Sequence, residues 1–211
     1  MTGVLITGGK SPRHEDIADV LSRAEVTATA DSGLEVAAEW GVEPDYIVGD
    51  MDSLSRLDVL SEYPEDRVRR FAREKDYTDT ELGLSMLWDA GCHEVALLGG
   101  GGGRLDHLLA ILALFERRPR PSSWYTHRDE VEVVEQEFVR YGLVGERISF
   151  FPVGTATCRM SSSGLKWPLD ELVWERGDVG ISNEVVSDPV RVSMTSGTLI
   201  MVRELRPGRE P

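Results

Sequence analysis

EVALLGGGGGRLDHLLAILALF, residues 94–115, decides the fold class of this chain. The stretch opens with a short apolar run at 94–98, which is typical of a buried strand. Five consecutive glycines follow, and then an apolar segment at 104–115 that has the length of a helix. A strand that leads directly into a helix is half of a parallel β-α-β unit. Because apolar residues lie on nearly all sides of 104–115, we expect that helix to be buried.

The first half of the chain repeats this alternation. Thr78 and Glu81 form a T-x-x-E capping box, which predicts that a helix begins there and places Asp79 in its first turn. The pattern predicts strands at 3–7, 26–30, 46–48 and 67–71, and helices at 14–23, 34–40 and 77–91. The fold class is therefore α/β, with an N-terminal, mostly parallel sheet that carries helices on both faces.

The second half changes character after Pro119 and Pro121. Helical periodicity is absent there, and the short runs separated by turn residues predict an antiparallel sheet domain. We place the domain boundary near 136–146, which gives domains 1–140 and 141–211. The expected strands are 130–135, 147–151, 155–160, 190–194 and 198–202.

Composition restricts the partners. The chain has 211 residues, 41% of them apolar, and a net charge of −14, which repels nucleic acid and anionic membranes. Cys92 and Cys158 fit no metal or redox spacing, so we expect buried or inert thiols. The first residues do not resemble a signal peptide, and no apolar run is long enough to span a bilayer. These features predict a cytoplasmic protein.

Acidic residues gather at the ends of the expected strands. In an open parallel sheet, chemistry collects beyond the carboxyl ends of the strands. Carboxylates at close range repel each other, and a divalent cation removes that cost. Residues i and i+2 of an extended strand end point to one side, so Asp50 and Asp52 are expected to share Mg²⁺, which prefers hard oxygen ligands. The expected rim carries Asp31, Asp50, Asp52, Asp76, Asp79 and Asp106.

The D-x-D pattern has another interpretation, since either aspartate is also suited to form a turn or to cap a helix. The four other aspartates on the same rim favour the metal.

The glycine run also allows two interpretations. Bare backbone N–H groups before a helix attract anions, and Arg104 adds a guanidinium for phosphate. The run lacks the G-K-[ST] ending of a P-loop, and a flexible connection is the alternative. We expect His107 to be an interior histidine rather than a metal ligand, because no second histidine is near.

Trp167 lies in GLKWPL, residues 164–169. A core position and a surface that stacks on a flat ligand or a cation both fit this residue. The sequence does not decide between them.

Six stretches together resemble the thiamin pyrophosphokinase family. They occur in the order found in that family and span nearly the whole chain. They are ADSG (30–33), PDYIVGDMDS (44–53), KDYTDTELGL (75–84), LLGGGGGRLDH (97–107), GLKWPL (164–169) and SNE (182–184).

The resemblance implies an enzyme that transfers the pyrophosphoryl group of ATP to the hydroxyl of thiamin, releases AMP and requires Mg²⁺. It implies that 1–140 is the catalytic domain, which binds ATP and Mg²⁺, and that 141–211 is a β-sandwich domain that binds thiamin. It also implies a homodimer with the active site at the subunit interface. The chain departs from the family pattern at Ser32 and Leu34 and has a longer glycine run.

Site residues follow from the same resemblance. The expected catalytic residues are Asp50, Asp52, Asp76 and Asp79, and three of them, Asp50, Asp52 and Asp79, are the expected Mg²⁺ ligands. The expected nucleotide-binding residues are Asp31, Gly102, Gly103, Arg104 and Asp106. The expected thiamin-binding residues are Trp167, Ser182 and Asn183.

Two other functions remain open at this point. The D-x-D pattern also fits a metal-dependent transferase of another kind, acting on a sugar nucleotide or in nucleotidyl transfer. A nucleotide-binding module without turnover is the second, although a passive anion binder would avoid so many carboxylates.

Overall fold

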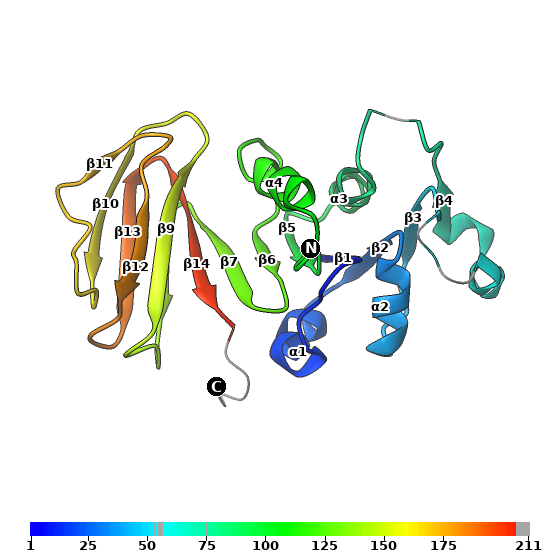
Figure 1. Ribbon diagram of the computed structural model, residues 1–211, viewed down its shortest axis with the longest axis horizontal. Coiled ribbons are helices and arrows are strands. Elements are labelled where there is room, and N and C mark those ends of the chain that lie inside the picture. Colours follow the sequence, from blue (N-terminus) through cyan, green and yellow to red (C-terminus); the bar gives the residue numbers. More distant parts are fainter. Residues whose placement is uncertain (53, 55–56, 75, 206–211) are drawn as a thin grey trace. The chain divides into compact units, whose positions relative to one another are not determined.

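A computed structural model describes residues 1–52, 54, 57–74 and 76–205. The chain divides into two compact units (Figure 1). Unit 1 contains Met1–Leu114 and Pro119–Arg128, and unit 2 contains Phe115–Arg118 and Asp129–Leu205. The division into functional domains at 140/141 stays a prediction.

Unit 1 is built on a parallel sheet. Each neighbouring pair runs parallel, and Thr7 at the end of one strand lies opposite Ala30 at the end of the next. The carboxyl ends therefore meet at one edge. The strand order is β6 (Ser123–Tyr125), β5 (Glu94–Leu98), β1 (Thr2–Thr7), β2 (Val26–Ala30), β3 (Tyr46–Gly49) and β4 (Val68–Arg70).

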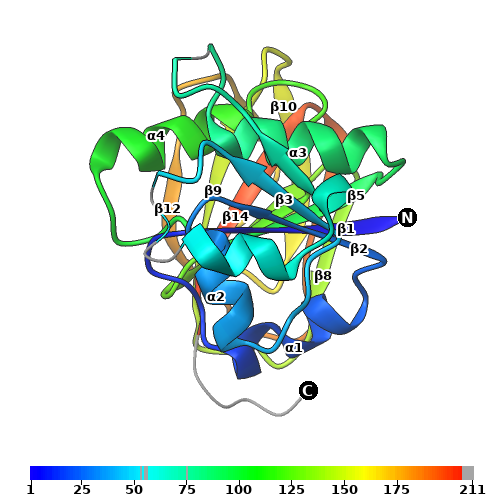
Figure 2. The same cartoon turned by 90° about the vertical axis from the view of Figure 1, so that its right-hand side faces the viewer.

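Helices cover both faces of this sheet, as the sequence predicted (Figure 2). Ile17 of α1 (His14–Ser22) and Ala37 of α2 (Gly33–Glu39) pack with Val4 and Ile6 of β1. Leu5, between them, faces the other way and lies against Gly83 of α3 (Asp79–Asp89). The remaining helices of unit 1 are α4 (Leu105–Leu114) and the short 3-10 helices η1 (Leu57–Glu62) and η2 (Glu65–Arg67).

The start of α3 is the predicted capping box. Thr78 Oγ1 accepts a hydrogen bond from Glu81 N at 3.2 Å, and Thr78 N donates to Glu81 Oε2 at 2.8 Å. The box fixes the first helical residue as Asp79. The capping box thus sets the position of a candidate ligand.

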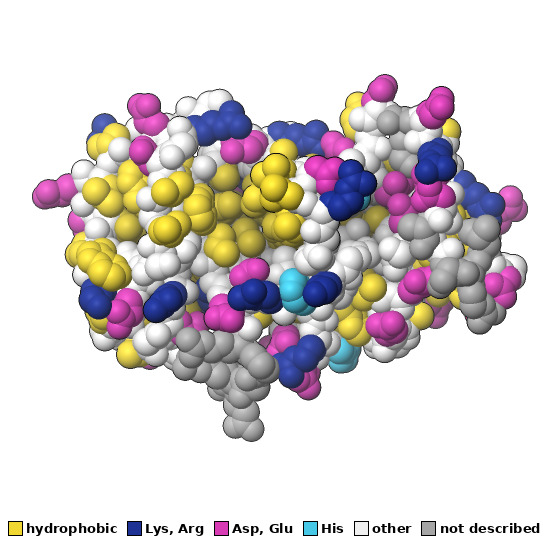
Figure 3. Space-filling view, viewed as in Figure 1, with side chains coloured by type: hydrophobic (Ala, Val, Ile, Leu, Met, Phe, Trp, Pro, Cys, Tyr) yellow, Lys and Arg dark blue, Asp and Glu magenta, His cyan; other side chains and the backbone are white. Residues whose placement is uncertain are grey.

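α4 differs from the expectation of a helix that is buried all round. Ile111 and Leu114 are buried, whereas Leu105, Leu109 and Leu112 are exposed. Apolar side chains gather over α4 on the face seen in Figure 3. A helix that lies on one face of a sheet buries only one stripe of its surface, so the expectation was wrong. The expectation of an interior His107 was wrong for the same reason, because this side chain is exposed.

Unit 2 consists of two antiparallel sheets around one core, which confirms the fold class expected for the second half. Phe138, Phe150, Val192 and Leu199 belong to this core. One sheet has the order β12 (Gly180–Glu184), β9 (Arg147–Val153), β14 (Thr198–Glu204), β7 (Asp129–Val134). The other has the order β11 (Val173–Trp174), β10 (Cys158–Ser163), β13 (Val190–Ser196), β8 (Glu137–Arg140).

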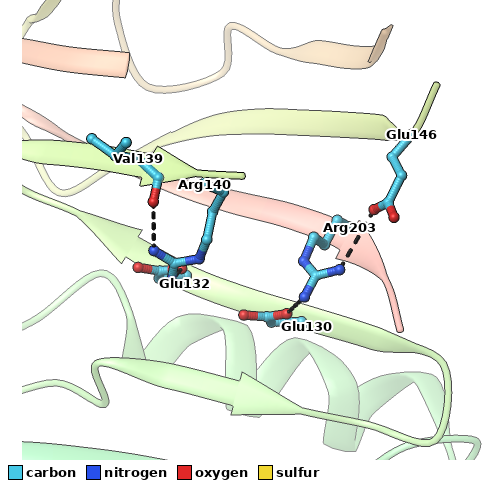
Figure 4. A network of polar contacts seen from close by, with 6 residues as sticks. All are labelled: Glu130, Glu132, Val139, Arg140, Glu146 and Arg203. Carbon is cyan, nitrogen blue, oxygen red and sulfur yellow. Dashed lines mark hydrogen bonds and ion pairs between the residues drawn. The ribbon is translucent and has the colours of Figure 1, made fainter. Parts of the chain in front are cut away.

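A buried ion network ties strands of unit 2 together (Figure 4). Arg203 of β14 forms an ion pair with Glu130 of β7, and its Nη1 lies 3.5 Å from Glu146 Oε2. Glu130 and Glu146 are both buried. Beside this group, Arg140 pairs with Glu132. Charges taken out of water need such partners, and this network supplies them between segments that are distant in the sequence.

Two smaller expectations can also be compared with the structure. Cys92 and Cys158 are free and buried, as predicted, and burial raises the pKa of both thiols. Within the described residues, no helix has the length and hydropathy needed to cross a membrane.

Candidate active site

Three carboxylates meet at the carboxyl edge of the unit 1 sheet. Asp31 follows β2, Asp50 follows β3, and Asp79 is the first residue of α3. One oxygen of each lies within 4.8 Å of the other two, and all three residues are partly buried. The sheet and the capping box thus bring together residues that are far apart in the sequence.

Unusual backbone angles make this approach possible. Asp31 has φ 47° and Met51 has φ 65°, both in the left-handed region. Gly49 has φ 147°, and a Cβ at this position would lie 1.9 Å from Asp31 Oδ1. Only glycine leaves room for the Asp31 carboxylate there. The same oxygen accepts a hydrogen bond from Met51 N at 3.3 Å.

The cluster carries an electrostatic cost. Burial raises the pKa of Asp31 to about 7, and the charge of Asp79, a hydrogen bond with Asp79 and the charge of Asp50 act in the same direction. One proton therefore stabilises the cluster when no cation is present. Hard carboxylate oxygens that repel one another are the donor set that suits a divalent cation such as Mg²⁺. The residues present fit such an ion.

Asp52 and Asp76 do not belong to this group of three. Asp52 does not lie on the extended strand end that was expected, because β3 ends at Gly49 and Met51 is left-handed. Asp52 lies close to Arg73, whose Nε is 3.4 Å from Asp52 Oδ2. The backbone N–H of Asp52 donates to Asp50 Oδ1 at 3.0 Å. Asp76 is exposed. Instead, Asp31 joins Asp50 and Asp79; it was expected both on this acidic rim and among the nucleotide-binding residues.

The glycine run between β5 and α4 is an ordered loop rather than a loose connection. Its Gly101 exchanges two backbone hydrogen bonds with Lys10, at 2.8 and 3.2 Å, and Gly100 N donates to Gly8 O at 2.8 Å. Gly102 has φ 63°. The loop after β1 is thus paired with the loop after β5, an arrangement that the sequence analysis missed. The consecutive glycines Gly8 and Gly9 were the only feature of the sequence that could have indicated this pairing of loops.

Arg104 and Asp106 contact each other. Arg104 Nε lies 3.1 Å from Asp106 Oδ1, and Arg104 Nη2 lies 2.5 Å from Asp106 Oδ2. The hydrogen bond from Arg104 lowers the pKa of Asp106 and keeps that carboxyl charged. Both side chains are exposed beside Gly102 and Gly103. The guanidinium expected for phosphate is therefore already paired in this structure.

Trp167 is 56% exposed, so it is not a core residue. Asn183 is buried and binds the backbone of Trp167 twice: its Oδ1 accepts from Trp167 N at 3.2 Å, and its Nδ2 donates to Trp167 O at 2.7 Å. Ser182 has φ 58°, and its N–H donates to Ser149 Oγ at 3.0 Å. Asn183 thus holds Trp167, which presents its ring at the surface of unit 2.

Each of the two units contains a match to a known protein family. Residues 17–122 match the family model described as thiamin pyrophosphokinase, catalytic domain, and residues 133–199 match that of the thiamin pyrophosphokinase vitamin B1 binding domain. The chain belongs to the thiamin pyrophosphokinase family. Asp31, Asp50, Asp79 and the glycine loop lie within the first match, and Trp167 and Asn183 lie within the second. The resemblance seen in the sequence is confirmed, and the chain is an enzyme of the thiamin pyrophosphokinase class.

Individual relatives support this membership. Thiamine pyrophosphokinase from Bacillus subtilis is 24% identical, over 94% of this chain and 96% of its own length. Thiamine pyrophosphokinase 1 from Arabidopsis thaliana is 26% identical over 74% of this chain, which spans 64% of that longer relative. The solved structure of the Bacillus subtilis protein superposes with a TM-score of 0.80, at 22% identity over 98% of this chain and all of that one. Thiamin pyrophosphokinase from Candida albicans has a TM-score of 0.71 at 20% identity, over 97% of this chain and 90% of its own, so both likenesses concern the fold.

Proposed function

We propose that this protein transfers the pyrophosphoryl group of ATP to the hydroxyl of thiamin, giving thiamin diphosphate and AMP. The observation that carries the proposal is the meeting of Asp31, Asp50 and Asp79 at the sheet edge, within the match to the catalytic domain. A thiamin pyrophosphokinase needs a cation at the phosphate chain, and these three carboxylates are the residues here that suit one.

The chemistry assigns a task to each group. The thiamin hydroxyl oxygen bonds to the β-phosphorus of ATP, the bond from that phosphorus to the oxygen bridging the α-phosphate breaks, and AMP leaves. Asp79 or Asp76 orients the hydroxyl and accepts its proton. Mg²⁺ held by Asp31, Asp50 and Asp79 would neutralise charge that develops on the phosphate oxygens. Asp52 stays a candidate ligand that would have to turn away from Arg73.

The two halves of the chain bind different substrates in this proposal. ATP and Mg²⁺ bind within residues 1–140, where the ordered glycine loop offers backbone N–H groups to the phosphates. Thiamin binds within 141–211, where Trp167 presents an exposed ring. We also keep the proposals that the enzyme works in the cytoplasm and forms a homodimer with its site at the interface. The exposed apolar face of α4, Leu105, Leu109 and Leu112, would suit such a contact.

The experiment that tests the function is direct. The protein is incubated with Mg²⁺, ATP and thiamin, and both products are quantified by chromatography. Thiamin diphosphate and AMP in equal amounts support the proposal, whereas ADP as the nucleotide product, or no thiamin-dependent AMP, contradicts it. The D-x-D transferase alternative is not favoured, since both family models that match the chain are those of thiamin pyrophosphokinase.

A further inference from the structure

A lysine ammonium lies over the ring of the exposed Trp167. Lys166 Nζ is 5.0 Å from the centroid of the Trp167 ring, within the range of a cation–π contact. The same ammonium lies 2.8 Å from Glu184 Oε2. An aromatic face and a carboxylate thus hold one cation between them. No role was expected for Lys166 or Glu184 from the sequence.

The backbone builds this arrangement. Lys166 N donates to Glu184 O at 2.8 Å, and the neighbouring residues Leu165 and Val185 form an antiparallel bridge. Asn183 then fixes Trp167 through the two hydrogen bonds described above. The backbones of Trp167 and Glu184 are therefore held by paired backbone and a buried amide, and the half-exposed side chain of Lys166 lies between the ring and the carboxylate.

We propose that Trp167 and Glu184 form a seat for an organic cation, which Lys166 fills while no ligand is bound and which the thiazolium ring of thiamin takes when it binds. This inference rests on the proposed function, and it makes Glu184 and Lys166 determinants of specificity for a cationic substrate. A flat, delocalised and weakly hydrated cation gains more from an aromatic face than an ammonium does. The displaced ammonium returns to water at little cost, because an exposed ion pair contributes little.

The charge state of the seat agrees with this role. The hydrogen bond and charge of Lys166 lower the pKa of Glu184, so the carboxylate stays ionised at neutral pH. When the ammonium leaves, the negative charge remains to attract the substrate cation. Lys166 and Glu184 should therefore affect thiamin binding with opposite signs.

The first test measures thiamin binding by calorimetry without ATP. We expect Lys166→Met to tighten the thiamin Kd about threefold to tenfold and Glu184→Gln to weaken it by a similar factor. Arg191→Met and Glu137→Gln are matched controls. Arg191 of β13 and Glu137 of β8 form an exposed ion pair, and these substitutions change the net charge of unit 2 by the same amounts as the two seat variants. Unchanged affinity in both seat variants, or equal shifts in the controls, would overturn the proposal.

The second test observes Lys166 itself. Because Lys166 Nζ lies over the indole, the protons of the adjacent ε-methylene should resonate upfield in a carbon–proton NMR spectrum, with Lys166→Arg providing the assignment. Thiamin, or tetramethylammonium as a simple cation, should move this resonance to its ordinary position if the ammonium is displaced. A resonance that stays in place under saturating thiamin would overturn the proposal. Displacement by tetramethylammonium in a protein that makes no thiamin diphosphate would support the seat and refute the proposed function instead.

Discussion

The carboxylates of Asp31 and Asp79 meet at one edge of the unit 1 sheet, where an oxygen of each lies within 4.8 Å of the other. Burial and the charge of Asp79 raise the pKa of Asp31 to about 7, so the cluster without a cation is partly protonated near neutral pH. Asp50 adds a third charge within 4.8 Å. The architecture of unit 1 thus concentrates negative charge where a nucleotide phosphate chain, itself anionic, would have to bind.

The first prediction concerns stability and pH. The pKa of Asp31 is about 7 in the folded protein and about 4 in an unfolded chain. Between these values the folded state keeps a proton that the unfolded state has released, so the free energy of unfolding should fall as pH rises from about 4 to about 7. The Asp31→Asn variant lacks the titrating carboxyl, so its free energy of unfolding should not fall in this way. In EDTA we expect the variant to be more stable than wild type by about 1–2 kcal/mol at pH 8, allowing for solvent screening of a half-buried group, and by less at pH 5.

Urea denaturation at the two pH values checks this expectation. Added Mg²⁺ should stabilise the wild type more than Asp31→Asn at pH 8, because binding to the native state shifts the unfolding equilibrium. Equal stability of the two proteins at both pH values would show that ionisation of the Asp31 carboxyl does not destabilise the folded protein.

The second prediction separates Asp50 from Asp52. Asp50 belongs to the group of three carboxylates, whereas Asp52 is about half exposed and lies next to Arg73. We expect Asp50→Asn to lower kcat by about two orders of magnitude, as loss of a transition-state contact does, and Asp52→Asn to lower it much less. Steady-state formation of AMP measures both. Equal losses would restore Asp52 as a ligand, as the sequence first indicated.

The third prediction uses a glycine. In Gly49→Ala the new methyl group would lie 1.9 Å from Asp31 Oδ1, so the carboxylate or the backbone must move. We expect lost metal affinity together with destabilisation of about 1–3 kcal/mol. Gly177→Ala is the matched control, because Gly177 also has a positive φ of 105° but has no atom near the position of a Cβ. Metal affinity that survives Gly49→Ala, or that falls as much in the control, would contradict the packing argument.

Several of these features could be read from the sequence. The β-α-β units and the capping box at Thr78 depend on local patterns, and local patterns are visible in one chain. Clustering of strand-end aspartates follows from parallel topology. The conformation of Met51 was not predictable, because the left-handed turn after β3 depends on how Asp31 packs against Gly49. That turn decided which aspartates meet.

Contacts between residues far apart in the sequence were also not predictable from the sequence. Nothing near Arg203 in the sequence indicates that it pairs with Glu130 and Glu146, which lie on distant segments. The exposed face of α4 was misread because composition shows how apolar a helix is, but not how much of it the fold covers.

The fourth prediction concerns this ion network. Arg203→Met leaves Glu130 and Glu146 buried without their cation, which costs about 3–5 kcal/mol in comparable sites. Combining Arg203→Met with Glu130→Gln and Glu146→Gln should recover part of that loss, because no uncompensated charge remains. Chemical denaturation of the full chain measures both variants. A single variant as stable as wild type would show that the network contributes little.

Metal binding at the cluster of Asp31, Asp50 and Asp79 tests the account most directly. Mn²⁺ is titrated into the protein in the presence of a non-hydrolysable ATP analogue, and free Mn²⁺ is followed by electron paramagnetic resonance. The account predicts saturable binding to the wild type that weakens at least about tenfold in Asp31→Asn, Asp50→Asn and Asp79→Asn alike. Wild-type affinity in all three variants would contradict it.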